Sequence, residues 1–196
     1  MDLQTRVKAI LMTPASEWLV IAREPADTNS LVFGYAAPLA AIPAVCRFLG
    51  MSMVGISVPF LGTIRIGVVR GLSSSIVSWV LTLVGVYIAA VVVEKLAPTF
   101  QSKGNTTQAL KLVVFAYTPV WIAGVLNLVP ALGVLVVIAA LYAIYLFYLG
   151  LSPIMSTPAD KVISYMVVSA LVIICLTFIL GLVTAAVAGA GGMGLA

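Results

Sequence analysis

Histidine is absent from this chain of 196 residues, and cysteine occurs only at Cys46 and Cys175. Without histidine the sequence has no histidine proton relay, no serine–histidine or cysteine–histidine nucleophile pair and no Cys/His zinc site. Both cysteines stand in apolar surroundings, and we interpret them as buried small hydrophobic residues. We therefore expect no enzymatic activity and no cofactor.

Charged residues are also scarce. They make up 8% of the chain and hydrophobic residues 63%, whereas soluble domains carry about 25% charge, so the composition indicates an integral membrane protein. The formal charge of +4 comes from scattered basic residues, which suits anionic lipid headgroups and not nucleic acid. No apolar run with a small-residue cleavage site follows Arg6 and Lys8, so we expect no cleaved signal peptide.

Long hydrophobic runs, in contrast, are abundant. The run from Val113 to Leu151 contains no charged residue and is interrupted only by Asn127 and Pro130. At about 1.5 Å of rise per residue, residues 110–128 and 131–151 would each reach roughly 30 Å, the thickness of a bilayer's hydrocarbon core. We predict a tight pair of membrane-spanning helices that turns at Asn127–Pro130.

Taken together, the chain predicts an all-α, polytopic membrane protein with five transmembrane helices preceded by short amphipathic helices at the membrane surface. Residues 1–28 form the cytoplasmic N-terminal segment, and residues 29–188 form the membrane domain. The spans are predicted at approximately 30–47, 72–96, 110–128, 131–151 and 160–188. Residues 48–71 are expected to be interfacial or re-entrant, and residues 189–196 to be a flexible tail.

The N-terminal segment contains two short helical patterns. Residues 2–12 place apolar side chains at helical spacing, with Arg6 among the polar residues elsewhere on the helical wheel. A second helix is predicted from Pro14, a residue that suits the first helical position, to Arg23. Trp18 is expected to anchor this helix at the membrane interface. The alternative for the segment is a mobile tail.

Prolines interrupt two of the predicted spans. Pro38 and Pro43 fall within 30–47, and each removes a backbone donor, so we expect this span to be kinked against its neighbours. Later in the chain, Pro119 frees a carbonyl, and the Thr118 hydroxyl can reach back into its own helix. Discontinuous helices of this kind also occur at the substrate sites of transporters.

The basic residues set the expected orientation. With five spans and the N-terminus inside, seven basic residues are cytoplasmic, and Arg47, Arg65 and Arg70 lie outside. A sixth span within 48–71 would divide the basic residues five to five. The positive-inside rule therefore favours five spans, with the N-terminus in the cytoplasm and the C-terminus outside.

Two spans carry a stripe of small residues at helical spacing. The stripe on 72–96 consists of Ser75, Ser78, Thr82, Gly85 and Ala89. The stripe on 160–188 consists of Ala170, Thr177, Gly181, Thr184 and Ala188. Small groups let another helix approach closely, so the stripes indicate either packing within one subunit or self-association into a homo-oligomer.

Two acids lie beside predicted spans, Glu94 and Asp160, on the same predicted face of the membrane. They are the candidates for a metal site or for acid–base chemistry. Each also has a structural explanation, because Glu94 adjoins Lys95 at a helix end and Asp160 falls in the first turn of a helix.

Basic and aromatic polar residues supply the remaining candidates. Arg47, Arg65 and Arg70 can bind lipid phosphates, pair with freed carbonyls or extend to the headgroups.

The central helix pair contributes Tyr117, Asn127, Tyr142 and Tyr145. A polar group in hydrocarbon needs a partner, so these residues either line a path for a small solute or bind the helices to one another.

Several motifs around the central hairpin recur in one membrane family. They are Tyr117-Thr118-Pro119, the Asn127–Pro130 turn, the Leu141–Leu151 run, Thr157-Pro158-Ala159-Asp160-Lys161, and Pro14 with Trp18. On these motifs residues 5–185, approximately, resemble the bacterial branch of the Yip family, the Ypt/Rab-interacting membrane proteins. The resemblance implies a five-helix membrane domain with a cytoplasmic N-terminus and no catalytic residue. Eukaryotic relatives are linked to Rab GTPases through a long N-terminal extension, and we do not expect that role here.

These observations favour a non-enzymatic integral membrane scaffold that associates with itself, with partner membrane proteins or with lipids. The alternative is a channel or transporter for an ion or small solute, through an oligomeric assembly. The broken first span favours this alternative, whereas the near absence of intramembrane charge and of an internal repeat opposes it. We expect the protein in the bacterial cytoplasmic (inner) membrane.

Overall fold

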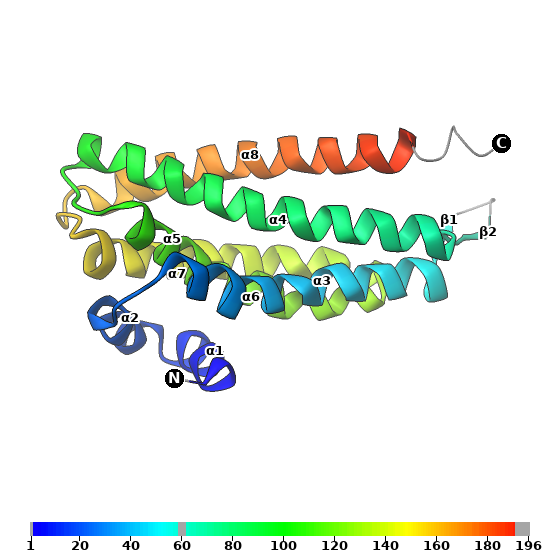
Figure 1. Ribbon diagram of the computed structural model, residues 1–196, viewed down its shortest axis with the longest axis horizontal. Coiled ribbons are helices and arrows are strands. Elements are labelled where there is room, and N and C mark those ends of the chain that lie inside the picture. The colour runs from blue at the N-terminus through cyan, green and yellow to red at the C-terminus, as the bar shows by residue number, and fades with distance from the viewer. Residues whose placement is uncertain (1, 59–61, 191–196) are drawn as a thin grey trace.

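The structure is a computed structural model that describes residues 2–58 and 62–190. In this part of the chain, five helical runs are long and apolar enough to cross a membrane: Ser30–Val54, Val68–Phe100, Thr106–Leu128, Pro130–Met155 and Val162–Val183. They follow two short helices, α1 (Leu3–Met12) and α2 (Pro14–Arg23), as Figure 1 shows. The predicted fold class, an all-α membrane protein with five spans after short N-terminal helices, is confirmed.

Each long run is built from one or more helical elements. The first joins η1 (Ser30–Ala36), α3 (Ala37–Leu49) and η2 (Gly50–Val54), and the second joins α4 (Val68–Leu96) and η3 (Ala97–Phe100). The third joins α5 (Thr106–Ala116), α6 (Thr118–Ala123) and η4 (Gly124–Leu128). The fourth joins η5 (Pro130–Leu135) and α7 (Val136–Met155), and the fifth is α8 (Val162–Ala190). A small antiparallel hairpin, β1 (Ile56–Val58) with β2 (Gly62–Ile64), connects the first two runs.

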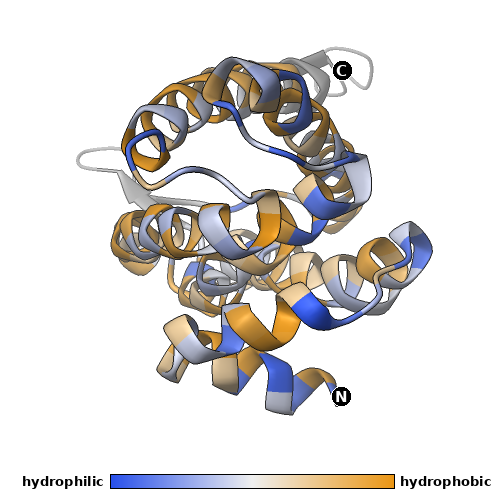
Figure 2. Cartoon of the chain, turned by 90° about the vertical axis from the view of Figure 1, so that its left-hand side faces the viewer, coloured by the Kyte–Doolittle hydropathy of each residue, from blue (hydrophilic) through white to orange (hydrophobic). Residues whose placement is uncertain are grey.

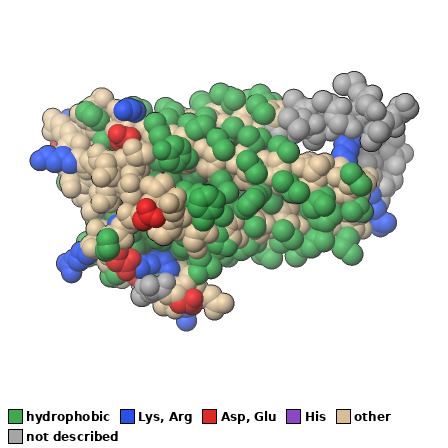
Figure 3. All heavy atoms as spheres, viewed as in Figure 1, with side chains coloured by type: hydrophobic (Ala, Val, Ile, Leu, Met, Phe, Trp, Pro, Cys, Tyr) green, Lys and Arg blue, Asp and Glu red, His purple; other side chains and the backbone are tan. Residues whose placement is uncertain are grey.

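The long helices form one elongated bundle. Helix α4 packs against α3, α5 and α8, while α7 packs against α5 and α2. In Figure 1, α1 and α2 lie along one side of the bundle, and the hairpin β1–β2 marks the opposite end from the α7–α8 connection. Hydrophobic side chains cover the middle of the bundle and charged side chains gather toward its ends (Figure 3). The end view in Figure 2 shows the same separation, with hydrophilic residues in the connections and in α1 and α2.

The segment 48–71 contains two kinds of structure. The first helical run continues past the predicted limit at Arg47 as far as Val54, and Gly55 then ends it with a positive φ of 79°. The hairpin follows, and α4 begins at Val68. An arginine does not need to end a span, because its long side chain can reach toward water from within the helix. The interfacial or re-entrant assignment of 48–71 stays a prediction, and residues 59–61 lie outside the described residues.

The irregularity predicted for the first span is confirmed. The element η1 is a π-helix, and the N–H of Ala37 donates to the Val32 carbonyl five residues earlier. Pro38 follows at once and has no N–H with which to continue the α-helical pattern. Pro43 lies within α3 and packs on Gly124, where an added Cβ would lie 2.5 Å from the Pro43 Cβ. The bend therefore fits the first run against the end of the third.

The third run is broken at Tyr117, between α5 and α6, next to Pro119 as predicted. The prediction for Thr118 was wrong. Its hydroxyl does not bond to its own helix but pairs with the Tyr35 hydroxyl of η1 at 3.0 Å, and both side chains are buried. Two irregular segments thus satisfy each other's polar side chains across the bundle, as a bilayer requires.

Part of the buried core lies beside α2. Trp18 is 0% exposed, and its ring meets Phe115 of α5 edge to face at 6.4 Å. Gly150 of α7 leaves room for it, because a Cβ there would lie 2.9 Å from the Trp18 Cε2 atom. The prediction that Trp18 is an interfacial anchor was therefore wrong: the residue anchors α2 to the bundle.

Buried charges fix the N-terminal helices in place. Arg6 is 5% exposed; its guanidinium forms an ion pair with the buried Glu17 and lies 2.5 Å from the carboxylate of Glu24. Lys111 of α5 is 2% exposed and donates from Nζ to the carbonyls of Ile21 at 2.8 Å and Glu24 at 2.6 Å. Arg6 was expected on the polar side of the wheel, and that expectation was wrong because the side chain has carboxylate partners inside the fold.

We predict that Arg6→Met lowers the free energy of unfolding by about 3 kcal/mol, because it leaves the buried Glu17 carboxylate without its cation. Thermal unfolding of the purified protein in detergent measures this loss. Protease cleavage between α2 and η1 should become faster at the same time. Lys8→Met is the matched control, since Lys8 lies on the same helix and is exposed. Equal losses of stability in the two variants would contradict the assignment of Arg6 as the cation that stabilises the buried Glu17 carboxylate.

Candidate functional site

A cavity of about 580 Å³ lies in the half of the bundle that ends at the hairpin. Its walls come from α3, α4, α8 and the segment in which η4 meets η5. The polar residues that line it are Arg47, Ser74, Ser75, Ser78, Thr82, Tyr117, Asn127 and Thr177. The cavity is therefore a polar-lined space within the apolar bundle.

The hydroxyl wall belongs to α4. Ser75, Ser78 and Thr82 follow one another at helical spacing and line the same side of the cavity. The Thr82 hydroxyl donates to the Ser78 carbonyl of its own helix at 2.8 Å. Within the described part of the chain, the hydroxyls of Ser75 and Ser78 have no hydrogen-bond partner. These two side chains are free to bind a ligand or water.

The small-residue stripe on this helix serves two purposes. Gly85 touches α8 so closely that a Cβ there would lie 2.6 Å from Leu180, and Ala89 is buried. The three hydroxyl residues toward the hairpin, Ser75, Ser78 and Thr82, line the cavity. In Figure 1, α4 and α8 diverge toward the hairpin end. Of the two interpretations of this stripe, packing within one subunit fits Gly85, which lies against α8.

Helix α8 forms a wall of the cavity with both polar and apolar residues. Thr177 and Gly181 line the cavity, and an added Cβ on Gly181 would meet no atom within 4 Å. The Thr177 hydroxyl donates to the Ile173 carbonyl of its own helix at 2.8 Å. Ala170 lies on the same helix, but the side chains of Thr184 and Ala188, also in the predicted stripe, lie outside the described residues. The Gly181 position thus adds to the open space instead of closing a helix contact.

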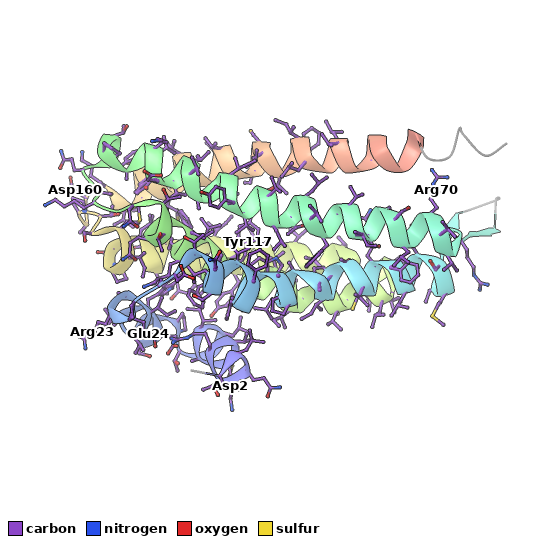
Figure 4. The ribbon with its side chains drawn as sticks, viewed as in Figure 1. Asp2, Arg23, Glu24, Arg70, Tyr117 and Asp160 are labelled. Atoms are coloured by element: carbon purple, nitrogen blue, oxygen red, sulfur yellow. The ribbon has the colours of Figure 1, made fainter. Side chains whose placement is uncertain are left out.

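Three of the predicted site residues meet at this cavity: Arg47, Tyr117 and Asn127 line it together. Arg47 lies on the face of α3 that also presents Pro43 and Met51 to the space. No carboxylate is among the described residues that line it, so the one formal charge on its wall is positive. Figure 4 shows Tyr117 inside the bundle and Arg70 near the hairpin end of α4.

The other candidates lie elsewhere. Arg65 precedes α4 and Arg70 lies in its first turn, and neither lines the cavity. The Tyr142 hydroxyl donates to the Leu11 carbonyl at 2.8 Å, and the Tyr145 ring lies 5.9 Å from that of Tyr142. Of the two interpretations left open for these tyrosines, helix binding fits Tyr142, which joins α7 to α1.

The two acids have structural partners. Glu94 accepts a hydrogen bond from the Thr106 hydroxyl at 2.7 Å, and the exposed Asp160 lies 3.7 Å from Lys161. No group of three residues able to hold a metal ion is found among the described residues. Glu94 thereby links the end of α4 to the start of α5.

The cysteines are both free thiols, and Cys175 is exposed on α8. The interpretation of the two cysteines as buried residues was therefore wrong for Cys175, and Cys46 is only partly buried. The physical reason is that α8 packs mainly on α4 and α7, which leaves much of its apolar surface uncovered.

The other half of the bundle is filled with side chains. Val86, Ala89, Ala90 and Val93 of α4 are each at most 4% exposed, and residues 112–114 of α5 are 0% exposed. The cavity therefore ends against close-packed residues. Hydroxyl, amide and guanidinium groups around such a space can bind a polar or anionic group.

Sequence reasoning missed the cavity itself, although it singled out several of its residues. The available signal was the group Ser73-Ser74-Ser75 with Ser78 in an otherwise apolar span, because polar residues inside a span mark an interior surface. Serine is both small and polar, so the pattern alone does not distinguish a helix face that packs against another helix from one that faces a water-filled cavity.

Comparisons with known proteins give one family. The Yip1 domain model matches residues 8–182 of this chain. Two curated relatives, each named inner membrane protein YohC, come from Escherichia coli K12 and from Escherichia coli O6:H1 strain CFT073. Each is 21% identical over 164 residues, which is 82% of this chain and 84% of the relative. No solved structure matches.

We predict that the cavity contains water. In a Cys46→Ala, Cys175→Ala background, Ser78→Cys should react with a charged, water-soluble thiol reagent about ten-fold faster than Ile76→Cys, since the thiolate forms only where water reaches it. Ile76 is the control because it lies on the same helix, is 53% exposed and does not line the cavity. Similar rates for the two thiols would exclude a wet cavity.

Proposed function

The chain belongs to the Yip1 domain family, and from this premise we propose that the protein is a non-enzymatic membrane scaffold that binds a partner molecule in the cavity. The observation that supports the proposal is the cavity between α3, α4 and α8, with its unpaired hydroxyls and its arginine. Its volume of about 580 Å³ falls in the range of small-molecule sites, roughly 300–1,000 Å³. The reactive pairs needed for acid–base or nucleophilic catalysis are missing from the lining residues described.

Binding fits this cavity better than conduction. The space ends against the close-packed residues Val86, Ala89 and Ala90. A solute that enters from the hairpin end would stop there, since protein interiors of this density leave no path for it. The protein would therefore hold its ligand.

We propose further that the scaffold acts by association. Helix α8 has exposed apolar side chains along its length, among them Leu171, Ile174 and Phe178 at 58%, 55% and 68% exposure. The bilayer covers such a surface in a membrane protein, and another helix can replace the lipid there. A second copy of this chain or another membrane protein would dock on α8.

The proposed location is the bacterial cytoplasmic membrane, in keeping with the inner-membrane name of the relatives. The proposed orientation places the N-terminus in the cytoplasm and the C-terminus outside. Arg47, Arg65 and Arg70 belong to the hairpin end, whereas Lys95, Lys103 and Lys161 belong to the connections at the other end. The more basic end is then cytoplasmic.

A transporter is the second candidate. The polar cavity together with the π-helical start and Pro43 of the first run favours it, because broken helices beside a polar space occur in transporters. It requires a second conformation in which the close-packed half opens.

Filling the cavity tests the proposed binding role. If the cavity binds a molecule, mass spectrometry should detect it in the purified native protein, and Ser78→Phe should reduce its amount at least about ten-fold because the ring would occupy its space. Ile76→Phe, two residues away on the exposed face of the same helix, should retain it. Loss in both variants, or in neither, would contradict the assignment of the cavity as a binding site.

Reporter fusions test the orientation. A reporter that is active only outside the cytoplasm should be active when fused after residue 190 and inactive when fused before α1, because the basic end stays inside. The reverse activities would overturn the proposed topology without affecting the cavity.

A further inference from the structure

We propose that the ligand of the cavity is an anionic phospholipid, with its phosphate at Arg47 and its acyl chains leaving between α3 and α8. The inference rests on the proposed binding role of the cavity and names the ligand class.

The first argument is charge. Arg47 is the one charged residue among the described residues that line the cavity, and no hydrogen-bond or ion-pair partner for its guanidinium is found in the described part of the chain. The side chain of Arg47 is exposed, so an anion from outside the chain can reach its guanidinium. A guanidinium binds phosphate oxygens through two parallel hydrogen bonds, so phosphate is the anion that suits it best.

The second argument is the set of donors around that charge. Ser75 and Ser78 present unpaired hydroxyls from α4, and Asn127 presents an amide from the turn between the third and fourth runs. These groups and Arg47 come from separate walls of one space. Together they can bind the remaining phosphate oxygens and the polar glycerol region, which a single arginine cannot do.

The third argument distinguishes an amphiphile from a free anion. The cavity is also lined by apolar side chains, including Pro43, Met51, Ile173 and Leu176. Helix α8 packs mainly on α4 and α7, and Gly181 leaves open space on the cavity side. The lining thus combines polar groups with apolar side chains from α3 and α8, and one phospholipid offers a partner to both. A free phosphate ion would leave the apolar part unused.

The experiment compares lipids on the full chain. The protein is purified in detergent, exposed to equal amounts of phosphatidylglycerol and phosphatidylcholine, and analysed by native mass spectrometry. We expect about a ten-fold preference for phosphatidylglycerol in the native protein, the size of one charge-assisted interaction. Arg47→Gln should abolish the preference.

Arg65→Gln is the matched control. It removes the same charge at the same end of the molecule, but Arg65 does not line the cavity. The control variant should keep the native preference. If both variants lose it equally, the lipid binds a general basic surface and the inference is overturned.

Two further comparisons complete the experiment. The first distinguishes a lipid phosphate from a soluble phosphate, and the second distinguishes failure of the lipid assignment from failure of the proposed binding role. Inorganic phosphate and glycerol 3-phosphate should not displace phosphatidylglycerol at millimolar concentration; displacement by either would identify a soluble anion as the ligand and overturn the lipid assignment. If Ser78→Phe removes a bound neutral molecule while Arg47→Gln has no effect, the cavity binds a ligand but not an anionic lipid. If neither substitution changes binding, the proposed function fails as well.

Discussion

The structure depends on the pairing of charges that have left water. Arg6, Glu17 and Lys111 are all at most 6% exposed, and each has a partner of opposite charge or a backbone carbonyl. Lys111 binds the two carbonyls at the end of α2, so a cation inside the third run holds the N-terminal helices on the bundle. The cost of leaving any of these groups unpaired explains why α1 and α2 pack here and do not lie free on the membrane.

Arg47 contrasts with this network. It belongs to the same bundle but lies beside a cavity that presents unpaired hydroxyls and no described carboxylate. Beside α2 the buried charged groups have partners within the chain, whereas the cavity toward the hairpin has hydroxyls and an arginine without a partner among the described residues. Stability is thereby concentrated beside α2, whereas the hairpin end retains groups that can bind something from outside the chain.

The sequence predicted the five apolar runs, the broken first span and the turn near Asn127, because the positions of hydrophobic residues and prolines can be read directly from it. It also predicted the Yip family, from the motifs around the central hairpin. It did not predict which side of α1 is buried, since Arg6 looks polar on a helical wheel and becomes an interior residue only through Glu17 and Glu24. It named Arg47, Tyr117 and Asn127 without showing that they meet. Their proximity arises from packing between segments far apart in the chain, which local patterns do not record.

The one-sided attachment of α8 has a consequence for biosynthesis. A ribosome completes the first four runs before α8 emerges, so the hydroxyl face of α4 meets the membrane before its final wall exists. Docking of α8 on Gly85 then adds this wall. A molecule already bound at Ser75 and Ser78 would contact α8 as well as the earlier helices and would favour the docking of α8. Assembly of the bundle and binding of the ligand would then occur in one step.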